Sequence, residues 1–375
     1  MPETGVKIEA VTAAIETLAP LRWAQAWDNV GLLIGDTSVQ VRRILLTIDT
    51  TRAVVAEAKK VKADLILSYH PVMFKGVKRI TTEGPAAHLY DLIRSGIGLY
   101  SFHTAMDVAP GGVNDALAQA VGMTQARPLG DFVEDPGGPS YKIVTFVPQD
   151  SLDKVADALY ASGAGSIGHY SHCGFQTEGT GTFLPLAGAH PTVGQRGRRE
   201  TVAEIKLETV VTAAAVGGAI AALHRAHPYD TPAFDVFRHY DLENRLGLGR
   251  IGPLAHPAKL QEVLARLKKA TGARTAGIVG KHNRQLKTAA VCAGSCGDLL
   301  SEVVTQGADL YVTGELTHHR ALEAQEAGLT CICLSHTVSE RFALKHIARQ
   351  LKSLLPGITL RQSRKDADPL EWSPL

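Results

Sequence analysis

Short apolar runs alternate with stretches of helical apolar spacing through the first third of the chain. The runs at 43–49, 64–68 and 98–102 are rich in Ile, Leu and other strand-forming residues, and 51–61 has the spacing of a helix. Strands that alternate with helices of about ten residues are typical of βαβ units. This region therefore predicts an α/β domain with a mostly parallel sheet.

The last third repeats the same pattern of strand and helix. In chain order we expect a strand at 288–293, a helix at 298–306, a strand at 309–313, a helix at 318–327, a strand at 329–334 and a helix through 340–351. Polar residues again collect where the strands stop. Because open α/β sheets bind ligands beyond the carboxyl ends of their strands, we expect a functional site there.

The middle of the chain has a different character. Residues 131–140 are rich in Gly, Pro and Asp and are typical of a linker. The elements expected after it are a strand at 141–147, a helix at 152–162, a strand near 205–211, a helix near 217–226 and a strand at 234–240. An order of β-α-β followed by β-α-β suggests a small ferredoxin-like α+β module, placed as an insert within a split α/β domain. The expected boundaries are 1–128 and 247–375 for the split domain and 129–246 for the insert.

The composition is that of a soluble globular protein. The chain has 375 residues, of which 45% are hydrophobic and 20% charged, so two domains are the natural expectation. The longest apolar runs, such as 44–48, are far too short to span a bilayer. The N-terminus has no basic segment followed by an apolar one, so no secretory signal is expected. We expect no membrane association and a cytoplasmic location.

Cysteine content and charge narrow the function classes further. The five cysteines are an odd number and none lies in the first 172 residues, which does not indicate a disulfide framework. Cys292 with Cys296, and Cys331 with Cys333, are interpreted either as ligands of a soft metal or as buried thiols in strands, and the second interpretation is favoured. The formal charge is +2, with no basic block longer than 196–199, so binding to nucleic acid is disfavoured.

Histidines and carboxylates supply the candidate chemistry. Two-metal sites need several such ligands that converge, with a carboxylate able to bridge the ions. The candidates are His70, His103, Asp107, Glu315, His319, His336 and Glu340. Three of these histidines follow expected strands of one presumed parallel sheet, each with an acidic residue nearby. His336 and Glu340 have an i, i+4 spacing that places both on one helix face if the helix begins early.

Structural interpretations of the same residues remain open. His70 before Pro71 could hydrogen-bond the turn, and His103 could be a buried histidine satisfied by Asp107. A solvated helix face is favoured for His318. Three further histidines lie among glycines of the expected insert, where a structural role is favoured; they are His169, His172 and His190. The glycine-containing segment 293–297 could hold an anion before a helix, but a tight strand-to-helix turn is favoured, and no Lys-Ser/Thr follows to make a P-loop.

Several segments resemble one known family. Residues 27–35 (Trp-Asp-Asn-Val-Gly-Leu-Leu-Ile-Gly) resemble the N-terminal signature of the Nif-three-like family, whose bacterial members are often labelled GTP cyclohydrolase 1 type 2 homologue. Further segments similar to that family are 69–76, 103–107, 110–114, 313–315 and 336–340. The insert resembles the PII-like domain that interrupts longer bacterial members, through 170–173, 178–183 and 227–230. The resemblance covers nearly the whole chain.

The resemblance implies a metal site and an assembly. His70, Asp107, His336 and Glu340 fall on the family's dinuclear metal ligands, and the family implies a homohexamer with inserted domains associating in threes. Many bacterial members have two consecutive histidines where this chain has Tyr69-His70. Tyr69 is a poor ligand at neutral pH because its ordinary pKa is about 10. One ion is therefore expected to bind more weakly, or His103 to compensate.

Two functional hypotheses follow. The first is a hydrolase that depends on two divalent metal ions, zinc first with manganese or iron as alternatives, and that acts on a nucleotide-like ligand. His103 and Glu315 would then be the catalytic residues that move protons. The second is a non-catalytic, metal-responsive regulatory or scaffold protein whose insert senses a small ligand. Turnover of a substrate separates the two.

Overall fold

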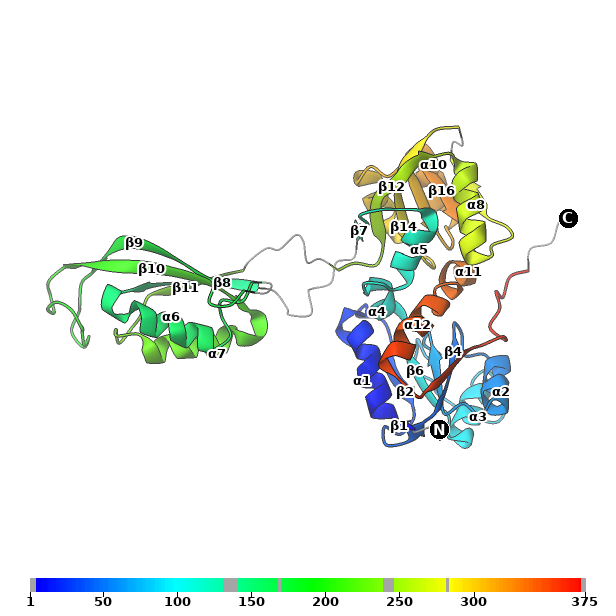
Figure 1. The fold of residues 1–375 in the computed structure, drawn as a ribbon, viewed down its shortest axis with the longest axis horizontal. Helices are drawn as coiled ribbons and strands as arrows, with labels where there is room; N and C mark the ends of the chain where they lie inside the picture. Colours follow the sequence, from blue (N-terminus) through cyan, green and yellow to red (C-terminus); the bar gives the residue numbers. More distant parts are fainter. Residues whose placement is uncertain (1–4, 131–139, 168–169, 239–245, 281–282, 372–375) are drawn as a thin grey trace. The chain divides into compact units, whose positions relative to one another are not determined.

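The chain folds into two compact units. The computed structural model describes residues 5–130, 140–167, 170–238, 246–280 and 283–371. One unit combines both ends of the chain, Met1–Val133 with Leu246–Leu375, and the other is Glu134–Arg245 (Figure 1). No helix among the described residues is long and apolar enough to cross a membrane.

The first sheet of the split unit is formed mainly by the N-terminal third. It has five strands in the order β17 (Thr359–Gln362), β4 (Arg43–Thr47), β5 (Leu65–Ser68), β6 (Gly98–Ser101) and β2 (Gly31–Ile34). The first four are parallel and β2 is antiparallel to β6. A separate short ladder pairs β1 (Val6–Lys7) with β3 (Gln40–Val41).

Helices cover both faces of this first sheet. Ile44 and Leu46 belong to the same core cluster as α1 (Ile8–Leu18) and α12 (Leu344–Leu354), whereas Leu45 packs with α2 (Arg52–Lys60) and α3 (Ala87–Ser95). Successive strand residues point to opposite faces, so an uninterrupted apolar run is what a sheet buried on both sides requires.

The second sheet of the split unit is formed mainly by the C-terminal third. Its strand order is β13 (Gly277–Val279), β16 (Thr330–Cys333), β15 (Leu310–Thr313), β14 (Leu286–Cys292), β12 (Arg250–Ala258) and β7 (Arg127–Pro128). Strands β14, β15 and β16 are parallel, and the outer three are antiparallel to their neighbours. Buried residues of α5 (Val113–Val121) and α8 (Leu260–Thr271) pack on one side, and those of α9 (Leu300–Thr305) and α10 (His318–Glu326) on the other.

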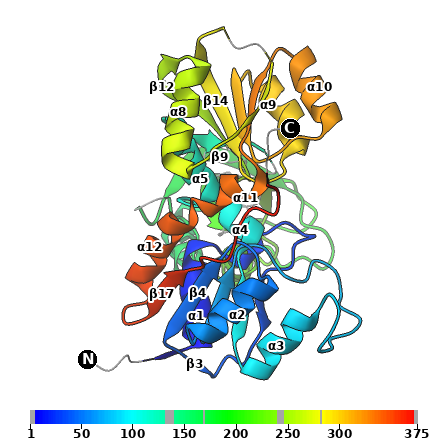
Figure 2. The same ribbon diagram turned by 90° about the vertical axis from the view of Figure 1, so that its right-hand side faces the viewer.

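The expectation of a single, mostly parallel sheet is wrong. The split unit contains two mixed sheets, and Figures 1 and 2 show the short helices α4 (His103–Val108) and α11 (His336–Arg341) between them. Hydrophobic patterning identifies strands but not which strands pair, and pairing here depends on contacts between distant segments. Strand β17 makes the point, because it follows α12 yet pairs with β4 from the N-terminal third.

The inserted unit has the order β8 (Ser140–Val147), α6 (Leu152–Ala161), β9 (Gly174–Phe183), β10 (Glu200–Thr212), α7 (Ala213–Ala226) and β11 (Phe234–Arg238). Its sheet is antiparallel with the order β11-β8-β10-β9, and this βαββαβ arrangement is ferredoxin-like. Strand β9 was not expected, because its sequence alternates Gly and Thr and its residues are largely exposed. The expected linker at 131–140 lies almost wholly outside the described residues. Kinship of this unit with PII-like domains stays a prediction.

Candidate metal centre

His70 lies just beyond the carboxyl end of β5. Its backbone amide donates to Ile48 O at 3.0 Å, which extends the pairing with β4 past the end of the strand. The neighbouring segment then places Asp49 next to the ring, with 2.9 Å between His70 Nδ1 and Asp49 Oδ1. A carboxylate on Nδ1 fixes the ring orientation and favours a free lone pair on Nε2, which is how metal-binding histidines are usually held.

His103 lies beyond the neighbouring strand β6 and begins α4. Its Nδ1 is 3.0 Å from Asp28 Oδ1, and Thr104 also donates to this carboxylate from its backbone and hydroxyl. Burial of Asp28 opposes ionisation, but the hydrogen bonds and the charge of His103 outweigh it and lower the pKa of Asp28. His103 is therefore held in the same way as His70.

His336 and Glu340 come from the second sheet, where β16 leads into α11. Ser335 adopts a left-handed conformation with φ of 77°, and its hydroxyl accepts from Val338 N at the start of the helix. Such conformations are costly for residues other than glycine and occur often at functional sites. The helix begins at His336, so the i, i+4 spacing brings His336 Nε2 to 3.2 Å from Glu340 Oε1. Glu315, which follows β15, lies 2.9 Å from His336 Nδ1.

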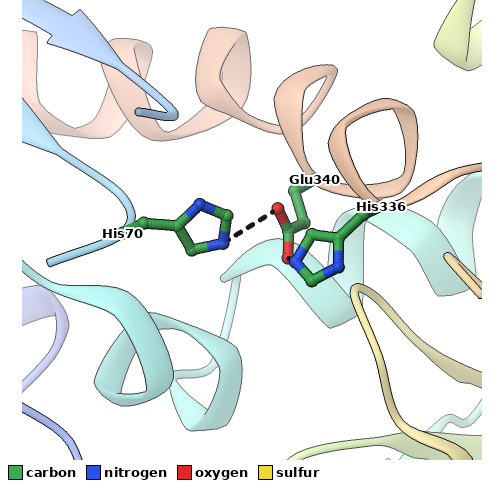
Figure 3. Close-up of side chains that lie close together, drawn as sticks. All are labelled: His70, His336 and Glu340. Carbon is green, nitrogen blue, oxygen red and sulfur yellow. Dashed lines mark ion pairs between the residues drawn. The ribbon is translucent and has the colours of Figure 1, made fainter. Parts of the chain in front are cut away.

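Residues from both sheets therefore converge on one point. His70, His336 and Glu340 each offer a ligand atom within 4.8 Å of the others, and Figure 3 shows both imidazoles directed at the carboxylate. Glu340 is buried, and its Oε2 forms no hydrogen bond although His70 Nε2 lies 3.3 Å away. A buried carboxylate oxygen without a bond, beside two oriented imidazoles, fits a divalent metal ion. This cluster could hold such an ion.

Gly294, in the loop after β14, leaves room for this carboxylate. A Cβ at Gly294 would lie 2.7 Å from Glu340 Oε1, and the residue has φ of +75°. The Gly294 amide donates to Ser339 Oγ and its carbonyl accepts from Gly314 N, so the loop is a bonded turn. This supports the strand-to-helix turn over an anion-binding loop.

Charges within the cluster stabilise one another. Burial opposes the charged form of His70, but Asp49 and Glu340 outweigh it and raise the pKa of His70 to about 10. The contact with Glu340, against the effect of burial, raises the pKa of His336 to about 9. Burial opposes ionisation of Glu340, yet the two histidines lower its pKa to about 2. Without metal the site therefore holds a carboxylate between two imidazolium groups.

Asp107 is half-buried on the His103 side of the centre. Burial, partly offset by His103 and by a hydrogen bond from Tyr69, raises the pKa of Asp107 to about 6. The Tyr69 hydroxyl donates to Asp107 Oδ1, and burial followed by the charge of Asp107 raises the pKa of Tyr69 well above its usual value. Tyr69 is therefore a neutral donor that holds Asp107.

The residues expected from the sequence differ in where they lie. Three of the four expected metal ligands form the cluster described above, and Asp107 lies outside that set. His103 and Glu315 were expected to move protons. Glu315 bonds His336 of the cluster, and the His103 ring lies beside that of His70. His319 is exposed on α10 beside His318, with 5.4 Å between their ring centroids. His169 lies outside the described residues.

Two carboxylates were missed in the sequence. Asp28 and Asp49 each orient a histidine, and neither stands at a fixed spacing from the residue that it serves. For Asp49 the available indication was its position at the end of the apolar run 43–49. For Asp28 it was its place in the family segment 27–35.

Comparison with known proteins decides the family. The model of the family Duf34/NIF3 (NGG1p interacting factor 3) matches residues 6–369. The chain belongs to the DUF34/NIF3 family.

Relatives within this family match over nearly the full length. A GTP cyclohydrolase 1 type 2 homolog of Halalkalibacterium halodurans is 35% identical, over 92% of this chain and 92% of its own length. A protein of the same name from Bacillus subtilis is 33% identical, over 98% and 99% of the two chains. The crystal structure of Staphylococcus aureus protein SA1388 superposes with a TM-score of 0.82 at 30% identity, covering 98% of this chain and 99% of that one.

Proposed function

We propose that this protein is a metal-dependent hydrolase of the DUF34/NIF3 family that binds two divalent ions and acts on a nucleotide-like substrate. The observation that carries the proposal is the buried Glu340 carboxylate, with one oxygen facing His336 Nε2 and the other facing His70 Nε2. A carboxylate whose two oxygens face different ligands suits a bridge between two ions. Histidine and carboxylate ligands suit zinc first, with manganese or iron as alternatives.

Asp107 and His103 are the residues that would hold a second ion. Asp107 is half-buried, and the charges of His103, Glu340 and His70 all act on it. A partly desolvated carboxylate with a raised pKa would bind a cation favourably, because the ion compensates the cost of its desolvation. We thus keep His70, Asp107, His336 and Glu340 as the proposed ligands, with His103 near the second ion.

When bound, divalent ions supply an activated water and stabilise the negative charge that develops on the substrate. The protein's own residues would then move protons. Glu315 is suited to this because its side chain is 49% exposed while it bonds His336. His103, only 11% exposed, is held by Asp28 and would exchange protons on the inner side of the site.

Exposed aromatic rings beside the centre suit a substrate with a planar ring. Trp27 and Phe74 are 62% and 52% exposed, and their rings lie 5.9 and 5.7 Å from that of His103. Asn29 Nδ2 donates to Met73 O at 2.6 Å and ties the two aromatic segments together. Such rings could contact a nucleobase by stacking. The names of the H. halodurans and B. subtilis relatives point in the same direction.

The remaining expectations belong to the same proposal. The five cysteines are free thiols, which supports a cytoplasmic location. A homohexamer and kinship of the insert with PII-like domains rest on the family resemblance, and light scattering of the full chain tests the first of these.

The first experiment is metal analysis followed by turnover. We expect close to two transition-metal ions per chain in protein purified without chelator, and a clear loss in Glu340→Ala because the shared ligand is gone. Glu326→Ala, on exposed α10, is the matched control and should keep the metal. Protein that binds no zinc, manganese or iron after reconstitution would refute the metal centre.

Turnover decides between the two functional hypotheses. Metal-loaded protein should hydrolyse GTP or a related purine nucleotide, and Glu315→Gln should slow this reaction without loss of metal. A loaded protein that hydrolyses none of them, yet changes the conformation of its insert with a ligand, would favour the regulatory or scaffold role.

A further inference from the structure

The inserted unit contains a cavity of about 560 Å³, within the range of small-molecule sites. Its floor is formed by the sheet face that carries Phe146, Glu204 and Lys206. Their strand neighbours Val147 and Ile205 belong to the core under α6 and α7, so by alternation the cavity lies on the opposite face. The site is separate from the metal centre, and the inference does not rest on the proposed hydrolase.

Two loops that close over this face are tied together. Thr192 Oγ1 donates to Pro228 O at 2.7 Å, and His190 N donates to Asp230 Oδ2 at 3.1 Å. The segments around 185–193 and 229–233, which line the cavity, are therefore held against each other. Because these two segments are already fixed, a ligand loses less binding free energy in ordering them.

His227 places Tyr229 at the wall of the cavity. Burial, only partly offset by its hydrogen bond to Phe146, lowers the pKa of His227, which bonds Phe146 O through Nε2 at 3.0 Å and accepts from Tyr229 N at Nδ1. The Tyr229 hydroxyl is buried, and no group among the described residues donates a hydrogen bond to its oxygen. The hydroxyl faces the Glu204 carboxylate, because burial, then a side-chain hydrogen bond to Glu204 and its charge, raise the pKa of Tyr229 to about 12. A neutral hydroxyl whose oxygen has no donor thus lies beside a carboxylate.

Glycines of β9 make room for this carboxylate. A Cβ at Gly181 would lie 2.0 Å from Glu204 Oε2, so the carboxylate rests directly against the strand backbone. A Cβ at Gly179 would meet nothing nearer than 3.8 Å, so open space lies beside it. The alternation of glycine and threonine at 178–183, which hid this strand in the sequence, is what opens the cavity.

The lining is acidic and aromatic. Glu204 and Asp230 line the cavity together with a single lysine, Lys206, whose Nζ is already paired with Glu208 Oε1 at 3.1 Å. The rings of Phe146, Phe183 and Tyr229 also line the cavity. Aromatic faces and carboxylates both attract cations, and the rings add affinity for an apolar body.

We propose that this cavity binds a small organic cation, with its ammonium group between Glu204 and the Tyr229 hydroxyl and its apolar body against the aromatic rings. The carboxylate accepts from the ammonium group, and the hydroxyl oxygen accepts from it as well. The ligand supplies the donor that the buried hydroxyl oxygen lacks among the described residues.

The test is calorimetry on the full chain with 2-phenylethylammonium, beside phenylacetate and 2-phenylethanol as anionic and neutral analogues. We expect the cation to bind at least about ten-fold more tightly than either analogue, and Glu204→Gln to remove this preference. Asp153→Asn, exposed on α6, should leave binding unchanged. Equal binding of the three compounds, or no binding of the cation at millimolar concentration, would overturn the proposal.

A second variant tests the place of binding without touching a charge. Gly179→Val adds bulk into the open space at a strand position that accommodates valine, and it should abolish binding while the thermal transition stays in place. Gln176→Val, on the same strand and outside the lining, is its control and should bind normally. Binding should also persist in Glu340→Ala, which separates failure at the cavity from failure at the metal centre. Unchanged binding in folded Gly179→Val would place the ligand elsewhere and refute the assignment.

Discussion

The candidate metal centre and the cavity of the insert each contain a carboxylate, buried at Glu340 and half-buried at Glu204, but its surroundings differ. Glu340 lies between two histidines, and those histidines are held in turn by Asp49 and Glu315. Glu204 has aromatic side chains and the Tyr229 hydroxyl around it. The first arrangement neutralises its charge internally and suits a compact ion. The second leaves its charge uncompensated and suits a larger organic ligand, so each site can be disabled while the other is retained.

The largest expected effect is the dependence of the melting temperature on pH in the metal-free protein. The pKa values of His70 and His336 are raised to about 10 and about 9, so their pairing with Glu340 stabilises the fold fully below the unfolded value near 6.5. That stability is lost as pH rises through the folded values. We therefore expect the melting temperature to fall between about pH 6.5 and 10.

Two carboxyl groups of the site contribute little to that fall. Glu340, with a pKa of about 2, is ionised throughout the interval, and Asp107, with a pKa of about 6, completes its ionisation near the lower end. Glu340→Gln should flatten the profile, because the imidazolium groups lose their partner. Metal binding should show the opposite trend and strengthen with pH, because the ion displaces those protons. A flat wild-type melting profile would contradict the charge assignment.

Loss of a carboxylate behind a metal ligand should have the next largest effect. Asp49→Asn removes the charge on His70 Nδ1, and partners of this kind are worth about 10- to 100-fold in metal affinity. The measurement is a zinc titration against a competing chelator. Asp91→Asn, at an exposed residue of α3 in the same unit, should bind zinc as the wild type does. Both variants should bind 2-phenylethylammonium normally. Equal zinc affinity in Asp49→Asn would show that this carboxylate has no role.

The smallest expected effect concerns Tyr69, which stands where many bacterial members of the family have the first of two consecutive histidines. Tyr69→Phe leaves the half-buried Asp107 carboxylate with one donor fewer, which should cost about 1–3 kcal/mol of the free energy of unfolding in the metal-free protein. Chemical denaturation measures this loss. Added metal should recover part of it if Asp107 is a ligand, because the ion replaces the missing donor. Tyr90→Phe, at a half-buried residue of α3, is the control.

The central strands of the split unit, β4, β5, β6, β14, β15 and β16, followed from the sequence because their patterns are local, whereas the short and outer strands did not. Runs such as 43–49 and 64–68 are apolar enough to be buried on both faces, and the structure has β4 and β5 there. The position of His70 and His336 just beyond strands followed from the same pattern. Strand β9 did not, because Gly and Thr on an exposed strand carry no apolar alternation.

The sequence by itself thus determined the central strands of both sheets, the family and three residues of the candidate metal cluster, since these depend on neighbours along the chain. Only the tertiary structure decided that the strands form two sheets, that β17 joins the first, and that Asp28 and Asp49 hold the histidines. It also brought the segments 178–183 and 227–230 to one cavity. The physical reason is that secondary structure follows local periodicity, whereas strand pairing and the meeting of side chains depend on the packing of segments far apart in the chain.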